Sequence, residues 1–182
     1  MLDAYLEETR ELFRKNKQAA EAAMAQVTDA DLVRALDPES NSIAIIAKHI
    51  SGNLRSRWRD FLTTDGEKPD RHRDAEFEAP PATRAELMAF WEAGWKCLAS
   101  ALDSLSGEDI GRTIYIRGEA HSVMKAIQRS LAHTASHVGQ IVFLAKHFRG
   151  SAWKTLSIAR GKSEEFNRKL ADRTSNWERR ST

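Results

Sequence analysis

Four long stretches of the sequence repeat their apolar residues at intervals of three and four, the spacing that places them on one face of an α-helix. These stretches cover about 2–26, 43–64, 83–105 and 121–149. Helices with one apolar face bury it against one another, and 182 residues are enough for one domain with a substantial core. The pattern therefore predicts an all-α fold, an up-down four-helix bundle, as a single domain over residues 1–171.

Residues that commonly cap helices lie where these stretches begin and end. Thr28-Asp-Ala-Asp31 matches a capping box that opens a short helical turn. Thr83-Arg-Ala-Glu86 matches another, which opens the third long helix. Gly150 follows the last long helix, and residues 162–171 predict a short C-terminal helix. Beyond it, residues 172–182 are expected to form a polar C-terminal tail.

Two connections between the predicted helices are informative. The loop from Thr64 to Ala82 is rich in charge and longer than most connections in a compact domain, and such loops often line functional sites. Residues 113–118 alternate between polar and apolar and predict half of a small hairpin near 113–123. We expect these two segments to form the rim of any pocket in the bundle.

The composition argues against several classes of protein. With 28 basic and 26 acidic residues the net charge is +2, so no global field favours nucleic acid, although residues 154–182 are modestly basic. No apolar run approaches the roughly 18 residues of a membrane span, and the charged N-terminus is unlike a signal peptide. The single cysteine, Cys97, suits a reducing compartment. We expect a cytoplasmic protein without nucleic-acid or membrane partners.

Three histidines lie at the margins of apolar helix faces. His133 and His137 are four residues apart, so they project from the same side of one helix about one turn apart. His49 lies beside the apolar stripe of the helix expected at 43–64. Three imidazoles can hold one divalent cation and leave coordination positions open, as catalytic zinc sites do. Ordinary polar residues at a helix edge would have the same spacing, so both interpretations stay open on geometry alone.

The helical projection also predicts which side chains face the core. In the helix over 121–149, the expected core residues are Met124, Ile127, Leu131, Ala135, Val138, Val142, Ala145 and Phe148. In the helix over 43–64, Ser51 is expected on the solvated face. In the helix over 121–149, Ser136 is expected on the solvated side, and Ser130 on the flank of the apolar stripe in line with His133 and His137.

The remaining histidines and the cysteine have ordinary explanations. His72 lies in the charged loop, His121 is expected at a helix start, and His147 lies near a helix end, where a cation suits the helix dipole. Cys97 lies in a segment typical of a core helix. We therefore expect no nucleophilic role for its thiol.

Two sequence motifs carry a resemblance to a known group of proteins. Ile-Ala-Lys-His-Ile-Ser-Gly-Asn contains His49, and Leu-Ala-His-Thr-Ala-Ser-His-Val-Gly-Gln-Ile contains His133 and His137. The chain resembles the DinB-like superfamily of metal-binding four-helix bundles, which includes bacillithiol- and mycothiol-dependent transferases. That superfamily takes one histidine from its second helix and a His-x-x-x-His pair from its last long helix, and all three positions are matched here.

The resemblance is greatest to an uncharacterised bacterial branch of that superfamily, through residues 64–77, 116–123 and 157–167. It implies a divalent metal, zinc or nickel, bound by the three histidines, and it implies homodimerisation. It does not specify a reaction, because members of the superfamily act on different small molecules. The catalytic residues and the cofactor-binding residues therefore stay unknown.

The first functional hypothesis is a metal-dependent enzyme. A cation on three neutral imidazoles would activate a low-molecular-weight thiol or water for attack on a small electrophilic substrate, as in a thiol transferase or a hydrolase. Guanidinium groups grip carboxylates and phosphates well, and the candidates for this role are Arg57, Arg73, Arg117 and Arg160, each of which also fits a surface charge. Spacing selects neither Asp60 nor Glu119 as a general base.

The second hypothesis is a noncatalytic metal-binding or stress-response module of the same fold. Structural zinc normally has four protein ligands, so this role would need a fourth ligand, such as Asp60 or His121. A third hypothesis, nucleic-acid binding through the basic C-terminal segment, lacks any recognised motif.

Overall fold

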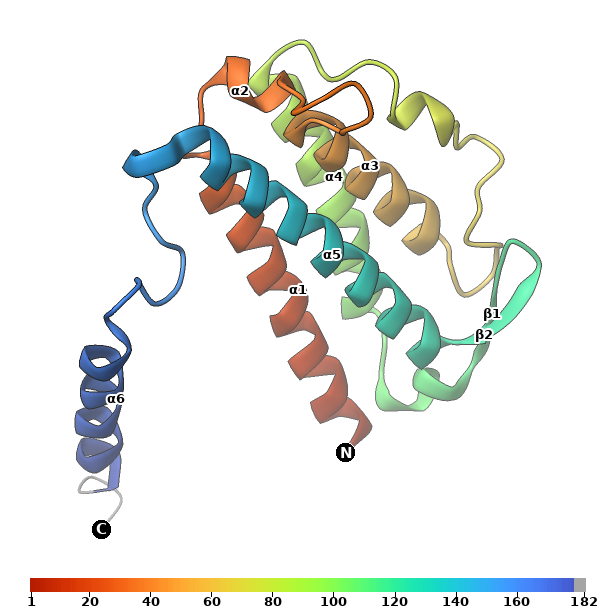
Figure 1. The fold of residues 1–182 in the computed structure, drawn as a ribbon. Coiled ribbons are helices and arrows are strands. Elements are labelled where there is room, and N and C mark those ends of the chain that lie inside the picture. The colour runs from red at the N-terminus through yellow and green to blue at the C-terminus, as the bar shows by residue number, and fades with distance from the viewer. Residues whose placement is uncertain (179–182) are drawn as a thin grey trace. The chain divides into compact units, whose positions relative to one another are not determined.

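The computed structural model describes the backbone of residues 1–178 and the side chains of residues 1–171. The long helices are α1 (Leu2–Met24), α3 (Ile43–Trp58), α4 (Arg84–Asp103) and α5 (Val123–Arg149) (Figure 1). The short elements are α2 (Asp29–Val33), the 3-10 turns η1 (Asp74–Glu76), η2 (Gly107–Gly111) and η3 (Gly150–Ala152), strands β1 (Thr113–Ile116) and β2 (Glu119–Ser122), and α6 (Ser163–Glu178). The predicted all-α helical bundle is confirmed. Within residues 1–178, no helix combines the length and apolarity that a membrane crossing needs.

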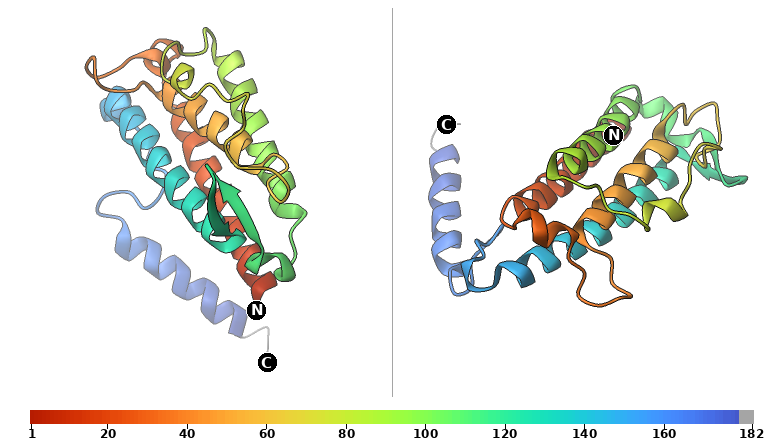
Figure 2. Two further views of the ribbon diagram at one scale, coloured as in Figure 1. Left: turned by 90° about the vertical axis from the view of Figure 1, so that its right-hand side faces the viewer. Right: turned by 90° about the horizontal axis from the view of Figure 1, so that it is seen from above.

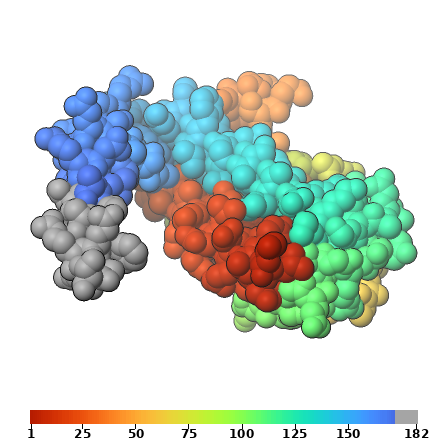
Figure 3. Space-filling model, turned by 90° about the horizontal axis from the view of Figure 1, so that it is seen from below, coloured from red at the N-terminus to blue at the C-terminus, as the bar shows by residue number. Residues whose placement is uncertain are grey.

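Each long helix packs against two others. α1 contacts α4 and α5, and α3 contacts the same two helices, so the four surround a common core. Figure 3 shows α1 and α5 side by side along one face of this unit. The core is filled by large apolar side chains, among them Leu6, Met24, Ile50, Leu54, Trp91, Leu98 and Ile127.

The predicted up-down alternation of helix directions is wrong for one pair, because α3 and α4 run in the same direction. The Ser51 hydroxyl donates to the carbonyl of Phe90, and further along the same helices Cys97 lies 3.9 Å from the carbonyl of Arg55. Later residues of α3 thus contact later residues of α4, which shows that the two helices are parallel. The segment 59–83 makes this possible because it returns along the length of the bundle before α4 begins (Figure 1).

The predicted position of Ser51 on the solvated face is wrong, because this residue is only 1% exposed. Its hydroxyl is satisfied by Phe90, and the opposite residue is glycine. A Cβ atom built on Gly94 would lie 2.6 Å from the Cα of Ser51. The glycine therefore allows α3 and α4 to approach more closely than larger residues would.

The predicted core face of α5 is partly wrong as well. Thr134 is completely buried, whereas Ala135 is exposed. Ser130 is also buried, and its hydroxyl accepts a hydrogen bond of 3.1 Å from the indole of Trp58. The buried face of α5 therefore includes two small hydroxyl residues that the helical projection did not assign to the core.

The helix boundaries follow local signals. The capping box of Thr28 and Asp31 is present at α2. α3 ends at Trp58, earlier than expected, and Asp60 has a positive φ of 48°. α5 begins after Ser122, whose hydroxyl accepts from the amide of Lys125, so His121 lies in β2 rather than at a helix start.

The predicted hairpin is confirmed, and it lies where α5 begins (Figure 2). Its two-residue turn consists of Arg117 and Gly118, with φ values of 58° and 76°. Positive φ at both positions matches the right-handed twist of the flanking strands. The Gly66 amide donates to the carbonyl of Tyr115 at 2.8 Å, so the segment 59–83 is joined to β1.

A second compact unit follows the unit Met1–Gly150 in the sequence and begins at Ser151. It contains α6, which continues beyond the helix expected at 162–171. The expected tail, 172–182, lies outside the residues whose side chains are described. The single domain over 1–171 stays a prediction, because a compact unit is not by itself an independently folding domain.

Candidate metal centre

The three histidines singled out from the sequence lie together between α3 and α5. The ring centroids of His49 and His133 are 5.2 Å apart, those of His49 and His137 are 5.0 Å apart, and those of His133 and His137 are 4.6 Å apart. One nitrogen from each ring lies within 4.8 Å of the others, so this group could hold a metal ion. α3 and α5 pack against each other in opposite directions, since His49 lies beside His137 whereas Trp58, further along α3, lies beside the earlier Ser130.

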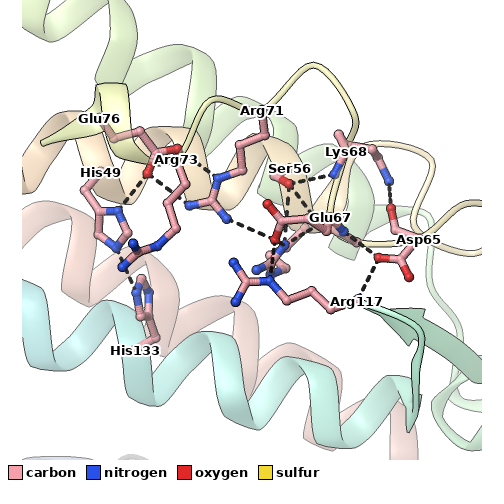
Figure 4. Close-up of polar contacts among 12 residues, drawn as sticks. His49, Ser56, Asp65, Glu67, Lys68, Arg71, Arg73, Glu76, Arg117 and His133 are labelled. Carbon is pink, nitrogen blue, oxygen red and sulfur yellow. Dashed lines mark hydrogen bonds and ion pairs between the residues drawn. The ribbon is translucent and has the colours of Figure 1, made fainter.

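His49 is oriented by a buried carboxylate. Its Nδ1 lies 2.7 Å from Oε2 of Glu76, and the two Glu76 oxygens also accept hydrogen bonds of 2.8 and 3.0 Å from Arg71 (Figure 4). Burial acts to raise the pKa of Glu76, but the hydrogen bonds from His49 and Arg71 outweigh it and lower the pKa. An ionised carboxylate accepts the Nδ1 proton of His49, so the Nε2 lone pair is directed toward Nε2 of His133.

Burial favours the neutral form of the other two imidazoles. Burial lowers the pKa of His133 to about 4, assisted by the neighbouring His137 and His49, and burial also lowers the pKa of His137. Nδ1 of His137 lies 2.7 Å from Oε1 of Gln140 and donates its proton there. Its Nε2 is therefore unprotonated, as metal binding requires.

The described residues fit a divalent cation. Nε2 of His49 and Nε2 of His133 are 3.1 Å apart, close to the roughly 3.3 Å that separates two nitrogens at about 2.0–2.1 Å from a tetrahedral ion. The acceptors on Nδ1 of His49 and His137 are partners that metal-binding histidines usually have. Among the described residues, Nδ1 of His133 is buried without a hydrogen-bond partner.

A glycine makes room for the carboxylate beside His49. A Cβ atom on Gly52 would lie 2.3 Å from Oε1 of Glu76. The ring of the next residue, Phe77, lies 4.6 Å from that of His49. The segment 59–83 therefore covers the first histidine as well as orienting it.

A pocket of about 200 Å³ opens beside His49 and His133. It is smaller than the roughly 300–1,000 Å³ typical of sites for drug-sized ligands, so it suits a small molecule. Its apolar wall includes Trp58, Ile114 and Ile116. The segment 59–83 and the hairpin both contribute to the lining, as predicted for the rim.

Asp65 joins these two rim segments. Its carboxylate accepts hydrogen bonds of 2.8 Å from the amides of both turn residues, Arg117 and Gly118. It also accepts one of 2.6 Å from the amide of Glu67. These backbone hydrogen bonds, led by that of Glu67, lower the pKa of Asp65. One charged side chain thus fixes the hairpin tip against the loop.

Glu67 connects three arginines at the pocket. Its Oε2 lies 2.9 Å from Arg57, 2.8 Å from Arg117 and 3.6 Å from Arg71. Burial acts to raise the pKa of Glu67, and the hydrogen bonds from Arg117 and Arg57 reverse the shift and lower it. Arg71 also binds Glu76, so an unbroken polar chain runs from the hairpin tip to His49 (Figure 4).

Several residues considered from the sequence lie elsewhere. Asp60 and His121 are not members of the three-histidine group, and the nearest carboxylate to His121 is Glu119, at 3.7 Å. Arg160 belongs to the second unit. Cys97 lines a different pocket with Asp60, and burial raises the pKa of its thiol.

Sequence reasoning missed the partners of the histidines. Gln140 follows His137 by three positions, so helical spacing could have identified it. Glu76 and Glu67 lie in a long loop, where no periodicity indicates which side chains turn inward.

The sequence was compared with known families and with individual curated proteins. No curated protein matches it. Residues 1–162 match a family described as "Protein of unknown function (DUF1572)". Because this match covers most of the 182 residues, the chain belongs to the DUF1572 family.

Proposed function

We propose that this protein is a metal-dependent enzyme of the DinB-like superfamily, with zinc or nickel bound by His49, His133 and His137. The observation that carries the proposal is the convergence of three imidazoles beside a pocket, two of them with Nδ1 held by an acceptor. A structural site would normally add a fourth protein ligand, and none of the other described His, Cys, Asp or Glu residues joins the group.

A cation held by the three histidines would lower the pKa of a thiol or water molecule and would so supply a nucleophile near neutral pH. The chain itself orients the imidazoles, through Glu76 and Gln140, and shields one side of the pocket from water with Trp58 and Ile114. None of the described lining residues is a carboxylate, which favours a nucleophile that needs no side-chain base. The proposed reaction is attack on a small electrophile, with a low-molecular-weight thiol as cosubstrate or with water.

The test begins with protein purified without a polyhistidine tag. Elemental analysis should find about one zinc or nickel ion per chain, and a screen of thiols and electrophiles should find turnover that a chelator abolishes. His137→Ala should remove both metal and turnover, whereas His147→Ala, an exposed histidine on the same helix, should retain them. Cys97→Ser should retain turnover, because its thiol lines a different pocket.

Two outcomes would contradict the proposal. Turnover that survives His137→Ala but not Cys97→Ser would identify the protein's own thiol as the nucleophile. Stoichiometric metal without turnover in a broad screen would favour the noncatalytic metal-binding or stress-response module instead.

We also propose that the protein is a cytoplasmic homodimer that associates through a helical face. Large apolar side chains are exposed on two adjacent helices, Leu2 and Leu12 on α1 and Phe143 on α5. Apolar residues exposed singly are common on protein surfaces, so the dimer proposal rests mainly on the resemblance to the DinB-like superfamily. Light scattering should give twice the chain mass at micromolar concentration, and a monomeric mass would contradict the dimer.

A further inference from the structure

The pocket beside the histidines carries an excess of positive charge. Five arginines line it, Arg57, Arg71, Arg73, Arg117 and Arg129, and no described lining residue is acidic. Behind the lining, two carboxylates pair with some of them: Glu67 with three and Glu76 with one. Three positive charges therefore remain without a buried counter-charge, next to a group that could hold a cation.

The five arginines differ in how many hydrogen bonds and ion pairs they make with the protein. Arg57 and Arg71 have side chains only 10% and 5% exposed, and both bind Glu67. Burial lowers the pKa of Arg57, and the neighbouring guanidinium groups of Arg71 and Arg117 add to the effect. These two arginines belong to the internal polar chain, and their hydrogen bonds are committed to the protein.

The other three arginines have N–H donors that no protein group uses among the described residues. Arg117 binds Glu67 through Nε alone, which leaves its terminal nitrogens for a ligand. Arg73 has one ion pair, at 3.7 Å, with Asp74, which is 95% exposed and so contributes little. Arg129 is exposed, and among the described residues no hydrogen bond or ion pair holds its guanidinium group.

These three arginines reach the pocket from separate elements. Arg73 comes from the segment 59–83, Arg117 from the hairpin turn and Arg129 from α5. In Figure 4 the Arg73 side chain extends toward the imidazoles of His49 and His133. Guanidinium groups that converge from different directions match the several oxygens of a carboxylate or phosphate group.

We propose that the substrate of this site is anionic, and that Arg73, Arg117 and Arg129 bind its carboxylate or phosphate group. The uncharged part of the molecule then lies against Trp58 and Ile116, with its reactive atom toward the histidines. That the bound anion is a substrate rests on the proposed function. The anion-binding site itself is inferred from the arginines alone.

Isothermal titration calorimetry tests the anion site directly. The probes are inorganic phosphate, succinate and its neutral counterpart succinamide, each titrated into metal-free and zinc-loaded protein. Phosphate or succinate should bind the metal-free protein at one site per chain, more weakly at high salt, and succinamide should not bind. Whichever of the two anions binds more tightly shows whether the site prefers a phosphate or a carboxylate group.

Matched variants locate the site. Arg129→Gln and Arg73→Gln should each weaken anion binding about tenfold, the loss expected for one charge-assisted hydrogen bond. Arg149→Gln, an exposed arginine on the same helix but outside the pocket, should change nothing. Metal affinity should stay unchanged in all three, which separates anion recognition from a damaged metal centre.

The failures of the two proposals are distinguishable. Arginine-dependent anion binding without turnover would retain this inference and contradict the proposed enzyme. Anion binding that needs zinc and ignores the arginine variants would overturn the inference. So would efficient metal-dependent turnover of neutral electrophiles that Arg73→Gln and Arg129→Gln leave unchanged.

Discussion

The carboxylate of Glu76 lies 2.7 Å from Nδ1 of His49, although the two residues are 27 positions apart in the sequence. This contact ties the long segment 59–83 to the second long helix of the bundle. It also links the imidazole, through Arg71 and Glu67, to the hairpin tip. The candidate centre therefore consists of three histidines together with the loop that orients one of them.

Glu76→Gln should weaken metal binding about 10–100-fold, the range typical of losing the carboxylate behind a ligating histidine. The amide retains the shape of the side chain but not its charge, so it stabilises a cation-bound imidazole less and removes the closer of the two ion pairs of Arg71. Competition with a chelator of known affinity measures the effect. Glu78→Gln, an exposed residue of the same segment, is the control, and equal affinities for both variants would contradict the orienting role.

Gly52→Ala should have a similar consequence by a steric route. The added methyl group would meet Oε1 of Glu76 at 2.3 Å. Either the carboxylate or α3 must move, and overpacking of this kind costs about 1–3 kcal/mol. We expect a lower free energy of unfolding in urea and weaker metal binding.

Gly139→Ala is the matched control for that substitution. Residue 139 also lies inside a long helix, but a Cβ atom there meets nothing within 4 Å. Alanine should therefore stabilise the protein by about 0.5–1 kcal/mol through its helix propensity. If the two variants unfolded at the same urea concentration, the close approach at Gly52 would not be a constraint.

The metal-free protein should lose stability as the pH falls from about 6.5 toward 4. His133 has a pKa of about 4 in the folded chain against a reference value of 6.5. Between these values the unfolded chain binds a proton that the folded chain does not, so acid favours unfolding in this window. Above pH 6.5 the contribution of this residue is fully present, and below about 4 it is lost.

Urea unfolding at several pH values measures this dependence. His133→Gln removes the titrating group, so its free energy of unfolding should vary less between pH 6.5 and 4 than that of the unaltered protein. Parallel curves for the two proteins would show that His133 titrates normally.

The sequence predicted the bundle and the histidines because both depend on periodicity. An i, i+4 pair on one helix stays on one face wherever the helix packs, so His133 and His137 could be identified without knowing the neighbours. His49 needed the additional inference that two helix margins face each other. The three lie together in the structure.

Details that depend on packing were not predictable in this way. Thr134 and Ser51 are buried because close neighbours accommodate small hydroxyl residues, which polarity alone assigns to the surface. The parallel direction of α3 and α4 follows from the path of the segment 59–83, which carries no periodic signal. The same reason explains why Glu76 and Glu67 were missed.

Asp65→Ala should release the hairpin tip from the segment 59–83. The carboxylate accepts from the amides of Arg117 and Gly118, both in a turn with positive φ, and its removal leaves these donors to solvent. Hydrogen exchange of these two amides should become faster, while that of core amides such as those around Leu54 changes little. Arg117 would then be less firmly held at the pocket, so phosphate or succinate should bind more weakly, with metal affinity unchanged.

Asp74→Ala, a fully solvated aspartate of the same segment, should alter neither exchange nor anion binding by a comparable amount. Unchanged exchange at Gly118 in Asp65→Ala would show that the hairpin holds its position without this contact.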